Sequence, residues 1–320
     1  MSFKKLVNKW IGFFGLRMER TISSLGNPLA FYGIKKEEYS ISNNNIFFKT
    51  LNLTIPFSNA YPITEGYEYA LKLSKKNTVK FILDKDEKPC IQINDLKFKI
   101  NDREELFILS EVFIEGAYNL ISATEKRVAL IDIGMNVGIT SLFYAAQNNV
   151  DKVFSFEPFQ PTFNMALKNF QLNEAYANKI QPNNFGLAKE AGELLVSYSL
   201  EQKGRMGLNG VPTDSNIIAT NVSNQSIILK PVNDEFIKIK EKVRNHFVVC
   251  KIDCEGAEFE IMDSLFSSGE MLLPDVYFIE WHYKTPDDIV SKLFAGKYDV
   301  INTTFKSQNS GMIYAMKNNN

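Results

Sequence analysis

Residues that commonly build disulfide and zinc sites are scarce in this sequence. Its 320 residues include three cysteines and two histidines. Cys250 and Cys254 are not in a C-x-x-C arrangement, and Cys90 lies far from both. A disulfide framework needs an even set of cysteines, and a structural zinc site needs closely spaced pairs of cysteines or histidines. We therefore expect reduced thiols and no structural zinc.

An excess of basic charge is also missing. The 36 Lys and Arg residues are balanced by 37 Asp and Glu residues, which gives a formal net charge of -1. No run of Lys and Arg raises the positive charge locally. Proteins that bind nucleic acid usually carry a basic surface, because contacts with phosphates dominate their affinity. Nucleic acid is therefore not expected as a partner.

Long hydrophobic runs are absent as well, and the N-terminal segment comes closest to one. Its apolar part at 10–16 is too short to span a bilayer and is not followed by a small-residue cleavage site. Residues 1–20 place Lys and Arg around Trp10, Phe13 and Phe14, a pattern typical of an amphipathic helix. Two interpretations stay open, peripheral membrane contact and docking on the rest of the protein. The expected location is cytoplasmic, with peripheral membrane attachment as the alternative.

The composition is that of a folded globular protein, with 45% hydrophobic and 23% charged residues. At this length we expect a core domain that carries a sizeable extension. Residues 1–121 are predicted to form an α+β N-terminal extension, with a hairpin at 90–100 and a helix at 102–117. Residues 122–320 are predicted to form a catalytic domain.

The catalytic domain is organised around the segment VALIDIGMNVGITS at 128–141. An apolar run, a carboxylate at Asp132 and a loop with Gly134 and Gly138 indicate a buried strand that turns tightly into a helix. A dinucleotide fingerprint would be G-x-G-x-x-G, but Asn136 stands in place of the middle glycine. An acid before the loop disfavours a pyrophosphate and suits a cationic ligand. S-adenosylmethionine, which carries a sulfonium and no phosphate, is such a ligand.

Two further strand ends carry residues that suit a nucleoside. KVFSFEP at 152–158 indicates a second buried strand that ends in Glu157. A carboxylate at this place can accept hydrogen bonds from both ribose hydroxyls. A third strand is predicted at 179–187, and Asn184 near its end is a candidate contact for the adenine edge. The alternatives are a solvated acid for Glu157 and a turn-forming role for Asn184.

Acidic residues gather after a fourth predicted strand, in FVVCKIDCEGAEFEIM at 247–262. Ligands of open α/β sheets bind at the carboxyl ends of the strands. If the backbone stays extended, Asp253 and Glu255 point the same way, and neighbouring carboxylates raise one pKa enough to poise a general base. Glu258 is predicted to stabilise the start of a helix through the helix dipole.

A fifth strand, DVYFIEWHY at 275–283, ends in Glu280 and His282. A closing hairpin is predicted at 298–317. Five parallel strands followed by a hairpin suit a seven-stranded, mostly parallel methyltransferase sheet with an antiparallel closing hairpin. The predicted fold is therefore α/β and Rossmann-like.

An insertion is predicted at 200–225, before the fourth strand. Its central part, GRMGLNGVPTDSN at 204–216, has three glycines and a proline. Long irregular loops in compact domains are usually functional or disordered. We predict a lid or acceptor-binding loop, with Arg205 as a contact.

Together these segments resemble the FkbM-type methyltransferases. IDIGMNVGIT, FSFEP and NFGL match elements of the family, and KIDCEGAE is similar to its signature D-x-E-G-A-E. The resemblance covers about residues 100–317 and departs from the family at Gly186, where alanine is commoner. It implies a class I fold, S-adenosylmethionine as donor and usually O-methylation of a sugar or other hydroxyl in glycan or natural-product pathways. By motif position it implies that Asp132, Gly134, Asn136, Gly138 and Glu157 hold the donor, and that Asp253, Glu255 and Glu258 lie between donor and acceptor.

The predicted mechanism is in-line methyl transfer to a hydroxyl, which must lose its proton. Asp253 is the first candidate for the base, His282 the second, and Glu255 lies beside them. A divalent metal held by Asp253, Glu255, Glu280 and His282 would instead lower the pKa of the hydroxyl. No ligand spacing demands that metal, so it is not expected.

Two other functions compete with methyl transfer. One is an NAD-dependent oxidoreductase, which the missing middle glycine disfavours, and the other is a non-catalytic nucleoside-binding module. The expected partner is a small-molecule or glycan acceptor. Nothing in the sequence indicates a particular oligomeric state.

Overall fold

The computed structural model describes residues 27, 29–119, 126–208, 210, 222–305 and 309–318. The helix predicted for residues 1–20 and the second half of the predicted lid lie outside them. The chain divides into two compact units, Met1–Ala117 and Tyr118–Asn320, close to the boundary predicted at 121.

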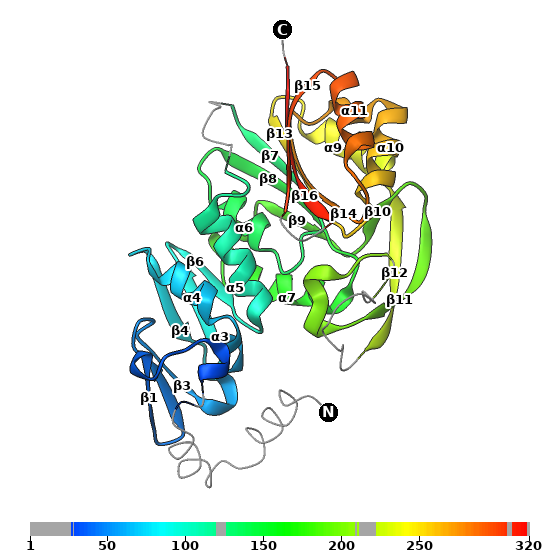
Figure 1. Cartoon of the computed structure of the whole chain (residues 1–320). Helices are drawn as coiled ribbons and strands as arrows, with labels where there is room; N and C mark the ends of the chain where they lie inside the picture. The colour runs from blue at the N-terminus through cyan, green and yellow to red at the C-terminus, as the bar shows by residue number, and fades with distance from the viewer. Residues whose placement is uncertain are drawn as a thin grey trace. The chain divides into compact units, whose positions relative to one another are not determined.

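The first unit holds two antiparallel three-stranded sheets and short helices (Figure 1). In the second sheet, Ile93 pairs with Leu96, so the hairpin predicted at 90–100 forms. Asp102 caps the following helix, because its side chain accepts hydrogen bonds from the backbone N–H groups of Glu104 and Glu105. The strands are β1 (Tyr39–Ser42), β2 (Asn45–Phe48), β3 (Leu53–Pro56), β4 (Val79–Leu83), β5 (Pro89–Ile93) and β6 (Leu96–Lys99). The helices are η1 (Ala30–Tyr32), η2 (Lys36–Glu38), η3 (Phe57–Asn59), α3 (Tyr61–Glu65), α4 (Tyr67–Ser74), α5 (Arg103–Ser110) and η4 (Glu111–Glu115).

The second unit is built on a seven-stranded sheet in the order β15-β16-β14-β13-β7-β8-β9. Neighbouring strands from β14 to β9 run parallel, and β16 is antiparallel to both β14 and β15. The predicted sheet, with its closing hairpin, is therefore confirmed. Its strands are β7 (Val128–Ile133), β8 (Val150–Phe156), β9 (Ile180–Asn183), β13 (Phe247–Ile252), β14 (Val276–His282), β15 (Tyr298–Thr304) and β16 (Ser310–Lys317).

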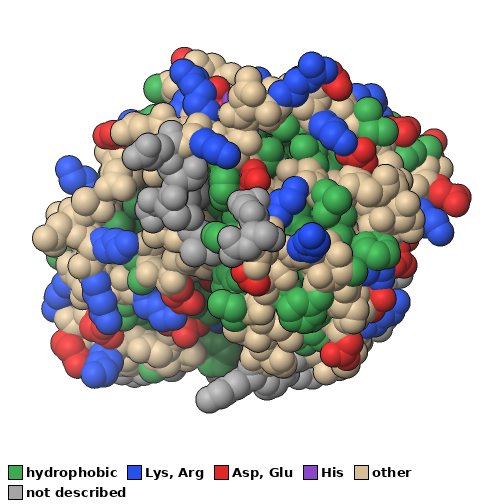
Figure 2. All heavy atoms as spheres, turned by 90° about the horizontal axis from the view of Figure 1, so that it is seen from above, with side chains coloured by type: hydrophobic (Ala, Val, Ile, Leu, Met, Phe, Trp, Pro, Cys, Tyr) green, Lys and Arg blue, Asp and Glu red, His purple; other side chains and the backbone are tan. Residues whose placement is uncertain are grey.

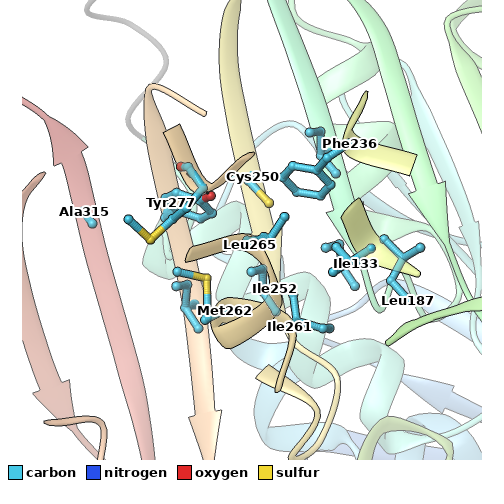
Figure 3. Close-up of a cluster of buried hydrophobic side chains, with 14 of the residues drawn as sticks. Ile133, Leu187, Phe236, Cys250, Ile252, Ile261, Met262, Leu265, Tyr277 and Ala315 are labelled. Atoms are coloured by element: carbon cyan, nitrogen blue, oxygen red, sulfur yellow. Dashed lines mark hydrogen bonds between the residues drawn. The ribbon is translucent and has the colours of Figure 1, made fainter. Parts of the chain in front are cut away.

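Helices cover both faces of this sheet, so its strands are buried on both sides. On one face α9, α10 and α11 pack against the strands, and α6 packs on β7, β8 and β9. The helices are α6 (Ile139–Ala145), α7 (Gln160–Gln171), α8 (Glu174–Ala177), α9 (Val232–Lys242), α10 (Glu258–Ser268), η7 (Glu270–Leu272) and α11 (Asp287–Ala295). Figure 3 shows the core on the α9 and α10 face, where Phe236, Ile261, Met262 and Leu265 meet strand residues Ile133, Cys250, Ile252 and Tyr277.

The structure corrects the prediction of the third strand. Residues 179–187 do not form one strand, because β9 ends at Asn183 and β10 (Gly186–Ala188) joins another sheet. The side-chain amide of Asn184 donates to the backbone carbonyls of Glu157 and Pro158, which fixes the chain between the two strands. β10 pairs with β12 (Ser223–Pro231), and β12 pairs with β11 (Gly192–Tyr198); η6 (Leu200–Arg205) follows β11.

Two features bear on the membrane and nucleic-acid partners considered from the sequence. Within the described helices, none is both long and apolar enough to cross a membrane. On the face seen in Figure 2, basic and acidic side chains are interspersed rather than separated into patches of one sign.

Candidate active site

A pocket lies at the carboxyl ends of β7, β8 and β13. Its lining includes Asn136 after β7, Glu157 after β8, Asp253 and Glu255 after β13, and Met206 after η6. The carboxyl ends of parallel strands are where open α/β sheets bind ligands. The segments that follow three of the predicted strands therefore meet in one pocket. Residues of the inserted segment also line it.

The loop after β7 has a backbone that requires glycine. Gly134 has a φ of 78° and Gly138 a φ of 79°, both in the left-handed region. A Cβ on Gly134 would lie 1.8 Å from the carbonyl oxygen of Asp253. The N–H groups of Gly134 and Met135 both donate to the carbonyl of Phe156. The loop is thus fastened to β8 and lies in direct contact with the loop after β13.

Glu157 is buried in the pocket wall and bound to the backbone of two loops. One carboxylate oxygen accepts from the N–H of Asn136 at 3.1 Å, and the other accepts from the N–H of Phe159 at 3.0 Å. Burial raises the pKa of Glu157 to about 8, although these two N–H groups lower it. A buried acid at this place matches the predicted ribose contact, which stays a prediction.

The raised pKa of Glu157 gives a prediction for stability. The folded protein holds a proton on Glu157 that the unfolded chain loses near pH 4.5, so folding stability should fall as pH rises toward 8. We expect E157Q, which cannot ionise, to lose this dependence, so that its Tm rises relative to the wild-type Tm between pH 5 and 8. Thermal unfolding across that range measures it. E174Q, the same change at an exposed residue, should follow the wild type. Parallel wild-type and E157Q profiles would contradict the raised pKa.

Asp132 lies beneath the pocket rather than in its lining. It is fully buried on β7, and one carboxylate oxygen accepts from the Ser141 hydroxyl at 2.6 Å. The other oxygen lies 3.4 Å from the ammonium of Lys251, which makes an ion pair but no hydrogen bond with it. The predicted contact between Asp132 and the donor stays a prediction.

Lys251 is a residue of the site that the sequence interpretation missed. Its side chain is buried, and its ammonium donates to the carbonyl of Gly134 at 2.8 Å and lies 3.3 Å from Asp253. Burial lowers the pKa of Lys251, but the carboxylates of Asp253 and Asp132 outweigh burial and raise it. A signal was available, because a lysine within an otherwise apolar buried strand needs a partner.

The loop after β13 is not extended, which corrects the reason given for pairing Asp253 with Glu255. Glu255 has a φ of 51°, and the chain turns there before α10 begins. Both side chains nevertheless line the pocket. The buried carboxylate of Glu258 accepts from the N–H groups of Cys254 and Gly256, so it holds this turn. This geometry agrees with the structural role predicted for Glu258.

Glu255 is the acid best poised to exchange a proton. Burial raises its pKa to about 7, although the positive charge of His282 lowers it. Its carboxylate accepts from the Tyr283 hydroxyl at 3.0 Å and lies 3.8 Å from Nε2 of His282.

His282 lies between carboxylates on both sides of its ring. Nδ1 is 2.8 Å from Glu258, and Nε2 is 3.4 Å from Glu280. Burial lowers the pKa of His282, but hydrogen bonds with Glu258 and Glu280 raise it to about 11. His282 is therefore expected to be an imidazolium near neutral pH, a charge state that does not favour its predicted role as a base.

The charge on His282 can be measured directly, because the chain has only one other histidine, His246. We expect nitrogen NMR of histidine-labelled protein to show His282 protonated at both ring nitrogens at pH 8. E258Q should lower its titration midpoint, because one negative charge is removed. H246Q assigns the two signals. A neutral His282 ring at pH 7 would contradict this account and support His282 as a base.

The alternative metal site is partly assembled. One ligand atom each from Asp253, Glu280 and His282 lies within 4.8 Å of the others, whereas Glu255 is outside this set. These residues do not fit a resident divalent cation well. The Lys251 ammonium already lies 3.3 Å from Asp253, and His282 holds its protons between Glu258 and Glu280.

Two other predicted residues lie at the margin of the pocket. Asn184, whose amide holds the Glu157 and Pro158 carbonyls, is outside the lining, and its adenine contact stays a prediction. Arg205 ends η6 and is also outside the lining, although Lys203 and Gly204 belong to it. The acceptor contact of Arg205 likewise stays a prediction.

Comparisons with known proteins find several methyltransferases that are similar to this chain. Methyltransferase sdnD of Sordaria araneosa is 22% identical over 205 residues, covering 58% of this chain and 78% of that protein. Methyltransferase 1 of Beauveria bassiana is 20% identical over 221 residues, covering 66% and 82%. The crystal structure of Methyltransferase FkbM from Methylobacillus flagellatus KT matches with 13% identity and a TM-score of 0.40. That match covers 62% of this chain and 46% of the bacterial protein.

The family match carries the assignment. The family described as Methyltransferase FkbM domain matches residues 132–300, which begin at Asp132 and include all the strand-end acids that line the pocket. This match spans more than half of the chain. The chain therefore belongs to the FkbM methyltransferase family.

Proposed function

We propose that this S-adenosylmethionine-dependent methyltransferase modifies a hydroxyl oxygen of an uncharged acceptor, such as a sugar, a glycan or a natural product. One observation carries the proposal: a single pocket is lined both by Glu157, the predicted ribose ligand, and by Glu255, whose pKa is raised to about 7. One acid suits the donor and the other suits a proton transfer from an alcohol. Because the chain belongs to a methyltransferase family, we no longer consider the oxidoreductase alternative.

The donor half of the pocket combines a residue that can bind a nucleoside with negatively charged side chains. Glu157 can accept the ribose hydroxyls, and Asn136 and Gly134 form the adjoining loop. S-adenosylmethionine supplies an electrophilic methyl group on a positively charged sulfur. Asp253 and Glu255 place carboxylates on the same pocket, which favours a cation there. Holding donor and acceptor in line can contribute roughly 7–11 kcal/mol toward the barrier.

Glu255 is the group that we expect to take the proton. As the acceptor oxygen forms its bond to the methyl carbon, the carbon–sulfur bond breaks and the hydroxyl proton passes to Glu255. Its pKa near 7 lets it be ionised and still accept a proton at neutral pH. Asp253, the first candidate from the sequence, is ion-paired with Lys251 and is the second candidate here.

The surroundings of Glu255 bear on the charge of the acceptor. Asp253 lines the same pocket, and Glu280 contacts His282 beside it. A phosphate or carboxylate next to the reacting hydroxyl would be repelled by these acids. Neutral sugars and other neutral alcohols meet no such penalty.

The test is methyl transfer from isotopically labelled S-adenosylmethionine to a panel of acceptors. The panel pairs neutral glycosides and alcohols with matched sugar phosphates and uronic acids, and includes amines. Label is expected on the hydroxyls of the neutral acceptors, with little on the matched sugar phosphates and uronic acids. Label found only on nitrogen would contradict the proposal. Donor binding without transfer to any acceptor would support the non-catalytic module.

The panel also tests the metal alternative. Transfer is expected to persist after treatment with a chelator, because Lys251 already lies beside Asp253 and His282 already lies beside Glu280, where the metal would have to bind. Loss of transfer that Mg²⁺ restores would instead support a metal held by Asp253, Glu280 and His282.

A further inference from the structure

Lys251 joins the two loops that form the donor side of the pocket. It lies on β13 directly beside Asp132 of β7 in the sheet register. Its ammonium donates a hydrogen bond to the carbonyl of Gly134 and lies within ion-pair distance of Asp132 and Asp253. One buried cation therefore contacts the strand before the β7 loop, the loop itself and the first residue after β13.

The carbonyl of Gly134 needs a partner that the sheet ladder does not provide. The ladder between β7 and β13 ends where the N–H of Asp253 donates to the carbonyl of Ile133. At Gly134 the backbone turns into the left-handed region, against the carbonyl of Asp253. The ammonium of Lys251 supplies the donor that holds the Gly134 carbonyl in place.

We propose that Lys251 is a positioning residue for donor binding, because its hydrogen bond to Gly134 fixes the loop at 134–138 in the shape that accepts the donor. Asn136 on this loop lines the pocket and donates its N–H to Glu157. A shift of Gly134 therefore displaces both the loop surface and a hydrogen bond to the predicted ribose ligand. The inference rests on the donor site of the proposed function.

The test separates positioning from simple stability. K251M removes the ammonium and leaves the fully buried carboxylate of Asp132 without a cation, so its Tm should fall strongly. The double variant K251M/D132N removes both charges, and its Tm should recover most of that loss. Its affinity for S-adenosylhomocysteine, measured by calorimetry, should stay about tenfold or more below that of D132N alone, as expected for the loss of one hydrogen bond from a charged donor.

K179M is the matched control. Lys179 also donates to backbone carbonyls, those of Ala145 and Gln147, but it is outside the pocket. K179M should bind S-adenosylhomocysteine as the wild type does.

Three other outcomes would contradict the inference or the donor site on which it rests. If K251M/D132N binds S-adenosylhomocysteine as tightly as D132N, Lys251 has no positioning role. A double variant that fails to recover cooperative unfolding also contradicts it, because the instability of K251M is attributed to the uncompensated Asp132 carboxylate. Absence of binding by the wild-type protein would overturn the donor site itself, and is distinguishable from these results.

Discussion

Replacing Gly134 by alanine is expected to weaken donor binding strongly. The residue has a φ of 78°, and its added Cβ would lie 1.8 Å from the carbonyl oxygen of Asp253. A left-handed backbone costs an alanine about 1–2 kcal/mol. Overpacking typically adds about 1–3 kcal/mol, so the combined cost of about 2–5 kcal/mol should lower the affinity for S-adenosylhomocysteine by roughly thirtyfold to several thousandfold. Calorimetry with G134A measures the loss.

G269A is the control that separates the clash from the backbone conformation. Gly269 has a φ of 80° at the end of α10, but an added Cβ would meet nothing within 4 Å. G269A should therefore lose some stability from the left-handed backbone and bind S-adenosylhomocysteine normally. If G134A binds as tightly as G269A, the two loops do not form the donor site.

Replacing Glu255 by glutamine is expected to lower kcat by about a hundredfold or more, the usual contribution of a general base. Glutamine has nearly the same shape and can still accept from Tyr283, so S-adenosylhomocysteine affinity should change little. The wild-type profile of kcat against pH should lose activity below about pH 7, where Glu255 becomes protonated. Steady-state kinetics with an acceptor identified by the panel measures both quantities.

Two further variants identify the base. Y283F removes the hydroxyl that donates to Glu255 and keeps the carboxylate, so activity should fall less than in E255Q. D253N removes the carboxylate that is ion-paired with Lys251 and should also cost less than E255Q. The opposite order, with D253N nearly inactive and E255Q active, would make Asp253 the base.

The sheet could be predicted from the sequence because parallel strands buried on both faces are continuous apolar runs. Segments such as 128–133 and 247–252 have that composition, and each is followed by polar residues that mark the strand end. The glycine loop was evident for the same reason, because glycines after such a run indicate close backbone approach. The positions of these strands, and their burial on both faces, could therefore be predicted from the local sequence.

Membership of a sheet depended on tertiary contacts and was predicted less well. The segment at 179–187 was predicted as one strand, yet β10 leaves the main sheet and pairs with β12. The division depends on the Asn184 amide, which binds carbonyls at the end of β8. Such a contact between distant segments leaves no local pattern in the sequence.

The candidate site shows the same limit. The acids at the strand ends were recognisable, but their charge states depend on partners from other strands. His282 of β14 meets Glu258 at the start of α10, and Lys251 of β13 meets Asp132 of β7. With these pairings we expect His282 to be positively charged and Glu255 to be the acid that exchanges a proton, whereas the sequence interpretation ranked Asp253 first and His282 second.

The central claim is that the pocket at the ends of β7, β8 and β13 holds the methyl donor with its sulfur toward the acids after β13. A crystal structure with S-adenosylhomocysteine tests it most directly. The account predicts the ribose hydroxyls on Glu157 and the sulfur facing Glu255 and Asp253. A nucleoside bound away from Glu157, or one whose sulfur faces away from both of the other acids, would contradict it.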